Sequence, residues 1–224
     1  MEELSIPSWV TKLKKIYEQD PIKWMWIAFT SLVAIVIISM LVFIVGKQRR
    51  EASEIFADGL FALSNGDYPT AVQIFDKVRS SYRLSGLKND AVFFSASARF
   101  GLERYNEAED LYRQYLNTNP EPDFAAKAEL DIGACREMSG DTAGALQTYK
   151  KARSKYSNSF LSKAFDVKIA RLSYSVGDLK TAQEIYSRLE TDTEGLWKEI
   201  ARGNRRLVFI EAPKDSVSIS NNSR

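Results

Sequence analysis

A long run without charge near the amino end is the clearest feature of the hydrophobic pattern. Trp24 to Val45 contains 22 residues and no Asp, Glu, Lys or Arg. As a helix that rises about 1.5 Å per residue, this run spans about 33 Å, which matches the hydrocarbon core of a bilayer. Asp20 followed by Pro21 is a typical helix start just before it. The pattern predicts a transmembrane helix over residues 24–46.

Two other kinds of segment can be this apolar, and both fit less well. The core helix of a soluble domain rarely extends so far without a charge. A cleaved signal peptide has a shorter apolar run, and Val45-Gly46-Lys47 lacks the small residues of a cleavage site. The helix is therefore predicted to remain in the mature protein.

Residues 1–23 form a short basic leader before the span. Apolar side chains from Ile6 to Tyr17 fall at helical spacing, with lysines on the other face. That is the pattern of an amphipathic stretch on a membrane surface, although a frayed, solvated leader fits the same residues. Four lysines precede the span and three basic residues follow it. The positive-inside rule therefore gives only slight support to a cytoplasmic amino terminus.

Three sets of residues recur with a period of 37 in the rest of the chain. Pairs of apolar helical runs are joined by short turns such as Gly66-Asp67 and Gly140-Asp141. The first run of each pair carries a small residue, and the second carries an alanine and then an aromatic. The small residues are Gly59, Ala96, Gly133 and Ala170; the alanines are Ala71, Ala108, Ala145 and Ala182; the aromatics are Phe75, Tyr112, Tyr149 and Tyr186. This regularity predicts an all-α solenoid of four helix pairs, in which the small residues let the two helices of a pair approach.

The period stops after residue 190. Leu196, Trp197, Ile200 and Ala201 then form one apolar stripe, which predicts a single helix that caps the open end of the solenoid. Repeats and cap together define a predicted domain over residues 52–212. Residues 213–224 are polar and are predicted to be disordered.

Composition narrows the chemistry available to this domain. The chain has 224 residues, a formal net charge of +2, no histidine and one cysteine, Cys135. These features indicate neither a basic face for nucleic acid nor a cysteine–histidine metal site. Catalysis without histidine would need a serine–lysine or carboxylate pair, and the sequence has no glycine-rich phosphate loop and no nucleophile elbow. We expect no metal, no cofactor, no small-molecule substrate and no enzymatic activity.

The repeat resembles the tetratricopeptide family. The stretches Gly59–Phe75 and Gly133–Tyr149 carry the family's small, turn, alanine and aromatic positions, and Pro120 stands where the family often has its closing proline. The sequence departs from the family in its period, which is usually about 34 residues. Asp58 and Ser95 also replace the usual leucine of the first helix. The resemblance implies a scaffold that binds other proteins.

The order of the segments resembles a narrower group. A basic leader, one span, the basic and glutamine-containing stretch Gly46–Ala52, and then repeats are similar to bacterial inner-membrane tetratricopeptide proteins described as ancillary subunits of the Sec translocon. This resemblance implies a cytoplasmic amino terminus, a periplasmic repeat domain, and association with the translocon and with membrane-tethered periplasmic chaperones.

Two other functions stay open. One is a membrane-bound adaptor that faces the cytoplasm and captures the acidic carboxyl terminus of a chaperone. Its relatives need lysine, arginine and asparagine at positions that hold Phe56, Leu60 and Phe94 here, and a carboxylate needs such charge-assisted partners. The other, and the least favoured, is an enzyme.

The first helices of such pairs line the inside of the superhelix. Offsets from the four small residues predict a partner-binding groove there, and its side chains are mostly apolar. The predicted groove residues are Phe56, Leu60, Leu63, Phe93, Phe100, Leu130, Met138, Val167, Arg171 and Tyr174. Such a surface suits an extended or helical apolar segment of a nascent chain or a chaperone. Alternatively, neighbouring pairs cover these side chains.

Overall fold

The computed structural model describes residues 20–192 and 195–211, and it is all-α in that part of the chain. The predicted tail over residues 213–224, and residues 1–19 of the predicted leader, lie outside the described residues. The first helix, α2 (Pro21–Ser64), is 44 residues long.

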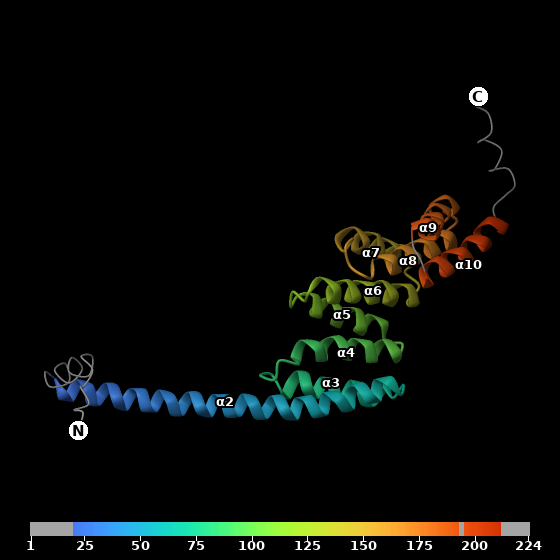
Figure 1. Cartoon of the computed structure of the whole chain (residues 1–224). Helices are drawn as coiled ribbons and strands as arrows, with labels where there is room; N and C mark the ends of the chain where they lie inside the picture. The colour runs from blue at the N-terminus through green and yellow to red at the C-terminus, as the bar shows by residue number, and fades with distance from the viewer. Residues whose placement is uncertain (1–19, 193–194, 212–224) are drawn as a thin grey trace, which may run out of the picture.

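Shorter helices follow α2 and form antiparallel pairs (Figure 1). They are α3 (Tyr68–Ser81), α4 (Lys88–Gly101), α5 (Tyr105–Leu116), α6 (Pro122–Met138), α7 (Thr142–Lys155), α8 (Ser162–Ser175), α9 (Leu179–Asp192) and α10 (Leu196–Glu211). The end of α2 pairs with α3, followed by the pairs α4/α5, α6/α7 and α8/α9, and α10 packs against α9 and α8. The predicted solenoid of four helix pairs with a capping helix is therefore confirmed.

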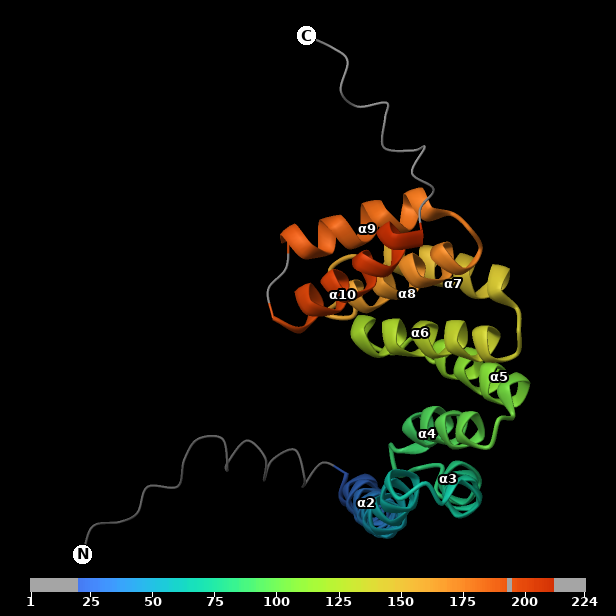
Figure 2. The same ribbon diagram turned by 90° about the vertical axis from the view of Figure 1, so that its right-hand side faces the viewer.

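Helix α2 contains both the predicted membrane segment and the first helix of the solenoid, without a break between them. It begins at a cap, where the Asp20 carboxylate accepts a hydrogen bond from the backbone N–H of Lys23 at 3.3 Å. Its charge-free part is exposed and is apolar and long enough to cross a membrane, whereas Ala52 is fully buried. The pairs stack to one side of α2 rather than continuing from its end (Figures 1 and 2).

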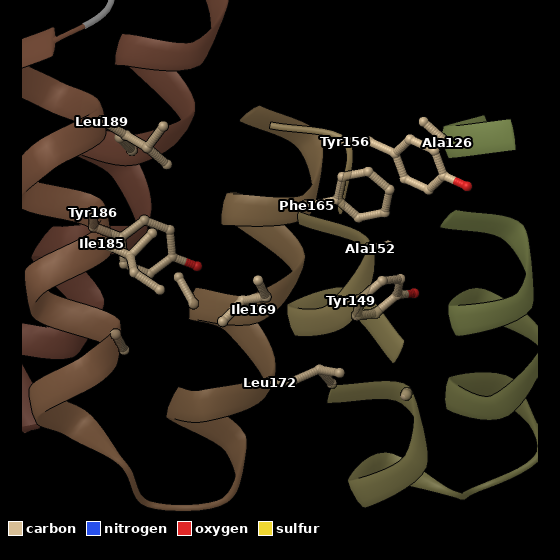
Figure 3. Close-up of a cluster of buried hydrophobic side chains, with 14 of the residues drawn as sticks. Ala126, Tyr149, Ala152, Tyr156, Phe165, Ile169, Leu172, Ile185, Tyr186 and Leu189 are labelled. Carbon is tan, nitrogen blue, oxygen red and sulfur yellow. The ribbon is translucent and has the colours of Figure 1, made fainter. Parts of the chain in front are cut away.

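The recurring small, alanine and aromatic residues are all buried, and they form the contact within each pair. A Cβ atom placed on Gly133 would lie 2.1 Å from Cε1 of Tyr149, so the ring occupies the space that a side chain would need. The same rings also reach the next pair, because the ring centroids of Tyr149 and Phe165 are 6.4 Å apart (Figure 3). Phe75 does the same in the first pair, since its ring lies 2.9 Å from a Cβ placed on Gly59 and stacks on the ring of Phe94 from the next pair.

The turns within the pairs need a residue with positive φ. Gly66, Gly140 and Gly177 supply it in three pairs, with φ of 76°, 88° and 85°. In the second pair the corresponding residue is Glu103, which takes φ of 62°. The left-handed conformation is thus imposed by the packing of the two helices, even where the residue is not glycine.

Ion pairs bridge consecutive helix pairs at each of the three seams. Each joins a second helix to the first helix of the following pair, and the two arginines Arg99 and Arg136 are 37 residues apart. The bridges are Asp76–Arg99 at 2.8 Å, Glu109–Arg136 at 3.0 Å and Arg153–Asp166 at 2.8 Å. The Asp166 side chain is buried, and it also meets Arg188 of α9 at 3.1 Å.

Candidate functional site

The candidate site is the A-helix face, meaning the surface formed by residues 52–64 of α2 together with α4, α6 and α8. Figure 2 shows α2 and α6 on one side of the stack and α3 and α5 on the other. All ten predicted groove residues lie on these first helices. Leu60, Met138 and Arg171 are exposed, and the other seven are half-buried.

The half-buried groove residues pack against the solenoid core. Phe56 and Leu63 pack against the cluster around Phe75, and Phe93 and Phe100 against the cluster around Tyr112. Leu130, Val167 and Tyr174 pack against the cluster of the last two pairs. These side chains therefore divide their surface between the core and solvent, so a change at any of them affects stability as well as binding.

Aromatic rings dominate the part of the face on α4. The ring centroid of Phe93 lies 5.3 Å from that of Tyr112 and 5.2 Å from that of Tyr115. The ring of Phe100 lies edge-on to that of Tyr105, with 5.4 Å between the two ring centroids. The ammonium of Lys127, from α6, lies 5.8 Å from the Phe93 ring centroid, within the range of a cation–π contact.

The part of the face on α6 and α8 carries ion pairs beside its apolar side chains. Lys127 pairs with Asp131 at 2.5 Å along α6. Glu137 forms ion pairs with Lys168, at 3.4 Å, and with Arg171, both from α8. Lys168 also lies 5.9 Å from the ring centroid of the buried Tyr149, within the range of a cation–π contact.

Burial changes the acid–base properties of Asp131, on this part of the face, and of Tyr149, which lies beneath it on α7. Burial raises the pKa of Asp131 although Lys127 opposes the shift. Burial also raises the pKa of Tyr149, and Glu137, which accepts a hydrogen bond from the tyrosine hydroxyl at 3.3 Å, raises it further. Tyr149 therefore stays a neutral hydrogen-bond donor at physiological pH.

The sequence interpretation included Arg171 but missed the other charged members of the face. Phe100 and Tyr174 stand four positions after the small residue of their pair, and in the third pair that position is Glu137, not Met138. The same count from Gly133 would have found it. Lys127, Asp131 and Lys168 stand before the small residue of their pair, so this count does not reach them.

The comparison with known protein families matches the third helix pair. A sequence profile described as "Tetratricopeptide repeat" matches residues 127–159. This part of the chain contains a tetratricopeptide repeat. The matched residues cover most of α6 and all of α7, including the contact between Gly133 and Tyr149. A comparison with curated protein sequences found no match. The tetratricopeptide repeat, together with its stacked helix pairs, supports a protein-binding scaffold with protein partners.

Proposed function

We propose that the protein is a membrane-anchored tetratricopeptide scaffold that binds partner proteins through its A-helix face. The observation that carries this proposal is helix α2, whose exposed apolar part leads directly into the first helix of the solenoid. An apolar surface of this size is costly in water and stable in a bilayer. Residues 24–46 act as the anchor in this proposal, and residues 52–212 act as the binding domain.

The surface chemistry favours a partner segment that is partly apolar and partly charged. Leu60 and the aromatic rings of α4 offer apolar contact, whereas Glu137, Lys168 and Arg171 offer charges of both signs. An amphipathic helix or an extended segment of a protein matches such a surface. This modifies the mainly apolar contact expected from the sequence.

Position-specific photocrosslinking in the intact cell tests this surface. A photoreactive amino acid at Met138 or Arg171, both exposed on the A-helix face, should yield crosslinks to a partner protein. The matched control positions are Lys150 and Glu184, which are exposed on the second helices α7 and α9. Crosslinks from the control positions, with none from Met138 and Arg171, would place the partner on the opposite face and refute the proposal.

For the side of the membrane, we propose a cytoplasmic amino terminus and a periplasmic solenoid near the Sec translocon and its chaperones. The support is the resemblance in segment order and the four lysines that precede the span. A phosphatase that is active only outside the cytoplasm, fused after Ala212, should be active. A stable but inactive fusion would favour the cytoplasm-facing adaptor instead.

A further inference from the structure

The connection between α3 and α4 lies beside α2, close to the point where the apolar run ends. The backbone N–H of Leu84 donates a hydrogen bond to Oε1 of Gln48 at 3.4 Å. Gln48 lies only three residues beyond Val45, so the two are about 4.5 Å apart along the helix axis. The Leu84 backbone is therefore held near the level of the last turn of the charge-free run.

That level corresponds to the headgroup layer of the bilayer that we propose α2 crosses. A hydrocarbon core of about 30 Å within a bilayer of about 40–45 Å leaves about 5–7.5 Å of headgroup region on each side. Gln48, about 4.5 Å beyond the apolar run, falls inside this layer. Because α2 has no break between the span and Ala52, no hinge is present to lift the α3–α4 connection out of it.

The side chains of this connection suit an interface between water and lipid. Leu84 is 56% exposed, although it is a large apolar residue. Arg83 and Lys88 on either side of it are exposed, as are Arg49 and Arg50, which follow Gln48 on α2. An apolar side chain among cations is the combination that inserts below anionic headgroups while the cations pair with phosphate.

We propose that the α3–α4 connection is a second membrane contact, in which Leu84 inserts into the interface and Arg83 and Lys88 bind anionic headgroups. This inference rests on the proposed membrane anchor. With two attachment points, α2 and the connection, the solenoid cannot tilt freely about the end of the span. The helix pairs then extend sideways over the bilayer, because they stack to one side of α2 (Figure 1).

The test uses the full chain with Cys135→Ala, since Cys135 is the one cysteine of the sequence. Leu84→Cys in this background carries an environment-sensitive fluorophore, and the protein is reconstituted into vesicles of phosphatidylethanolamine and phosphatidylglycerol. A lipid with a nitroxide on its headgroup is the quencher. Asn65→Cys is the matched control, because Asn65 is exposed at the turn that ends α2, about 25 Å beyond Gln48. Phe43→Cys reports on the anchor itself.

We expect blue-shifted emission at position 84 and quenching several-fold stronger than at position 65. Equal quenching at positions 84 and 65, with strong quenching at position 43, would overturn the inference and leave the anchor standing. An unquenched label at position 43 would overturn both. Arg83→Glu with Lys88→Glu should lower the quenching at position 84 several-fold, and unchanged quenching would refute the role of the two cations. The helix itself should tolerate this change, since a glutamate is favourable in the first turn of α4.

Discussion

At the scale of single residues, three of the four turns within the helix pairs use the same two residues, a glycine followed by an aspartate. Asp67, Asp141 and Asp178 each follow the glycine of a turn, and their carboxylates accept a backbone N–H three residues later. In the second pair, Glu103 and Arg104 occupy these two positions, and Arg104 provides no side-chain cap for α5. That turn therefore lacks both stabilising features of its neighbours.

Glu103→Gly with Arg104→Asp should stabilise the solenoid by about 1–2 kcal/mol. Glycine relieves the left-handed strain at φ of 62°, and aspartate supplies the missing cap. Urea unfolding followed by circular dichroism measures the change. As a control, Asp141→Ala removes the equivalent cap of α7 and should cost about 1 kcal/mol. A double variant no more stable than the parent would show that the local geometry of this turn differs from that of the other copies.

The seam between the first two pairs has a predictable response to acid. Burial alone would raise the pKa of Asp76, but hydrogen bonds from Arg99 and Ser95 and the charge of Arg99 hold that pKa below its usual value of 3.8. Since the folded state has the lower pKa, the unfolded state binds more protons in acid. The stabilisation by this pair is therefore complete above about pH 4 and is lost as the pH falls further.

Arg99→Met should destabilise the protein by about 1–2 kcal/mol at pH 7, because Asp76 loses the nearer of its two arginine partners and Glu107 loses its ion pair with Arg99. The difference between the variant and the parent should shrink as the pH falls below about 4. Urea unfolding at a series of pH values measures both effects. Arg113→Met is the control, since the exposed Arg113 pairs with Glu109 within one helix and Glu109 keeps Arg136 as its partner across the seam; this change should cost at most about 0.5 kcal/mol. A difference that stays constant down to pH 3 would exclude Asp76 as its source.

At the scale of elements, α2 is unusual, because its charge-free part is exposed whereas its last turns pack in the solenoid. The backbone is helical through Lys47–Glu51, where the apolar run gives way to the solenoid, and Lys47 and Glu51 form an ion pair along the helix at 3.8 Å. Every backbone hydrogen bond of this stretch continues the helix into the first pair. We therefore expect the anchor and the solenoid to move as one rigid body.

Arg50→Pro should separate the two parts of α2. Proline removes a backbone hydrogen bond and clashes with the preceding turn, at a cost of about 3 kcal/mol in a helix interior. Spin labels at Phe43 and Asn89 should give a narrow distance distribution in the parent and in Arg50→Lys, and a broad one in Arg50→Pro. Broad distributions in all three proteins would mean that α2 bends at the membrane surface.

At the scale of the whole molecule, the helix pairs bury their apolar surfaces against one another and against α10. Ala201 of α10 is fully buried at the end of the stack, and each of the core clusters joins neighbouring helices of the solenoid. The described part of the solenoid thus draws its stability from contacts between pairs and needs none from the charge-free part of α2.

Residues 52–212, produced without the anchor, should be a soluble, almost wholly helical monomer or dimer. The physical reason is that the first core side chain, Ala52, lies after the end of the apolar run. Far-ultraviolet circular dichroism and light scattering after size-exclusion chromatography measure helicity and mass. Substantial strand content, or a fragment that dissolves only in detergent, would contradict this expectation.

The periodic part of this fold was readable from the sequence because it depends on short-range rules. The recurring small, alanine and aromatic residues repeat every 37 positions, and an antiparallel helix pair buries them by bringing small residue and aromatic together, as Gly133 and Tyr149 show. The same holds for the turn glycines, which must take positive φ, and for the apolar stripe of α10. Length and absence of charge were enough to indicate a helix able to span a membrane.

Tertiary structure alone decided which of these side chains remain accessible. The sequence assigned Phe93 to a groove, whereas packing places its ring partly against Tyr112 and Tyr115 of another helix. The tertiary structure also brings together Glu137 and Lys168, 31 residues apart, and Gln48 and Leu84, 36 residues apart. Such contacts depend on the angle between stacked pairs and on the unbroken course of α2. Neither the angle between pairs nor the course of α2 can be predicted from the sequence of one repeat, because each follows from how the whole set of helices packs.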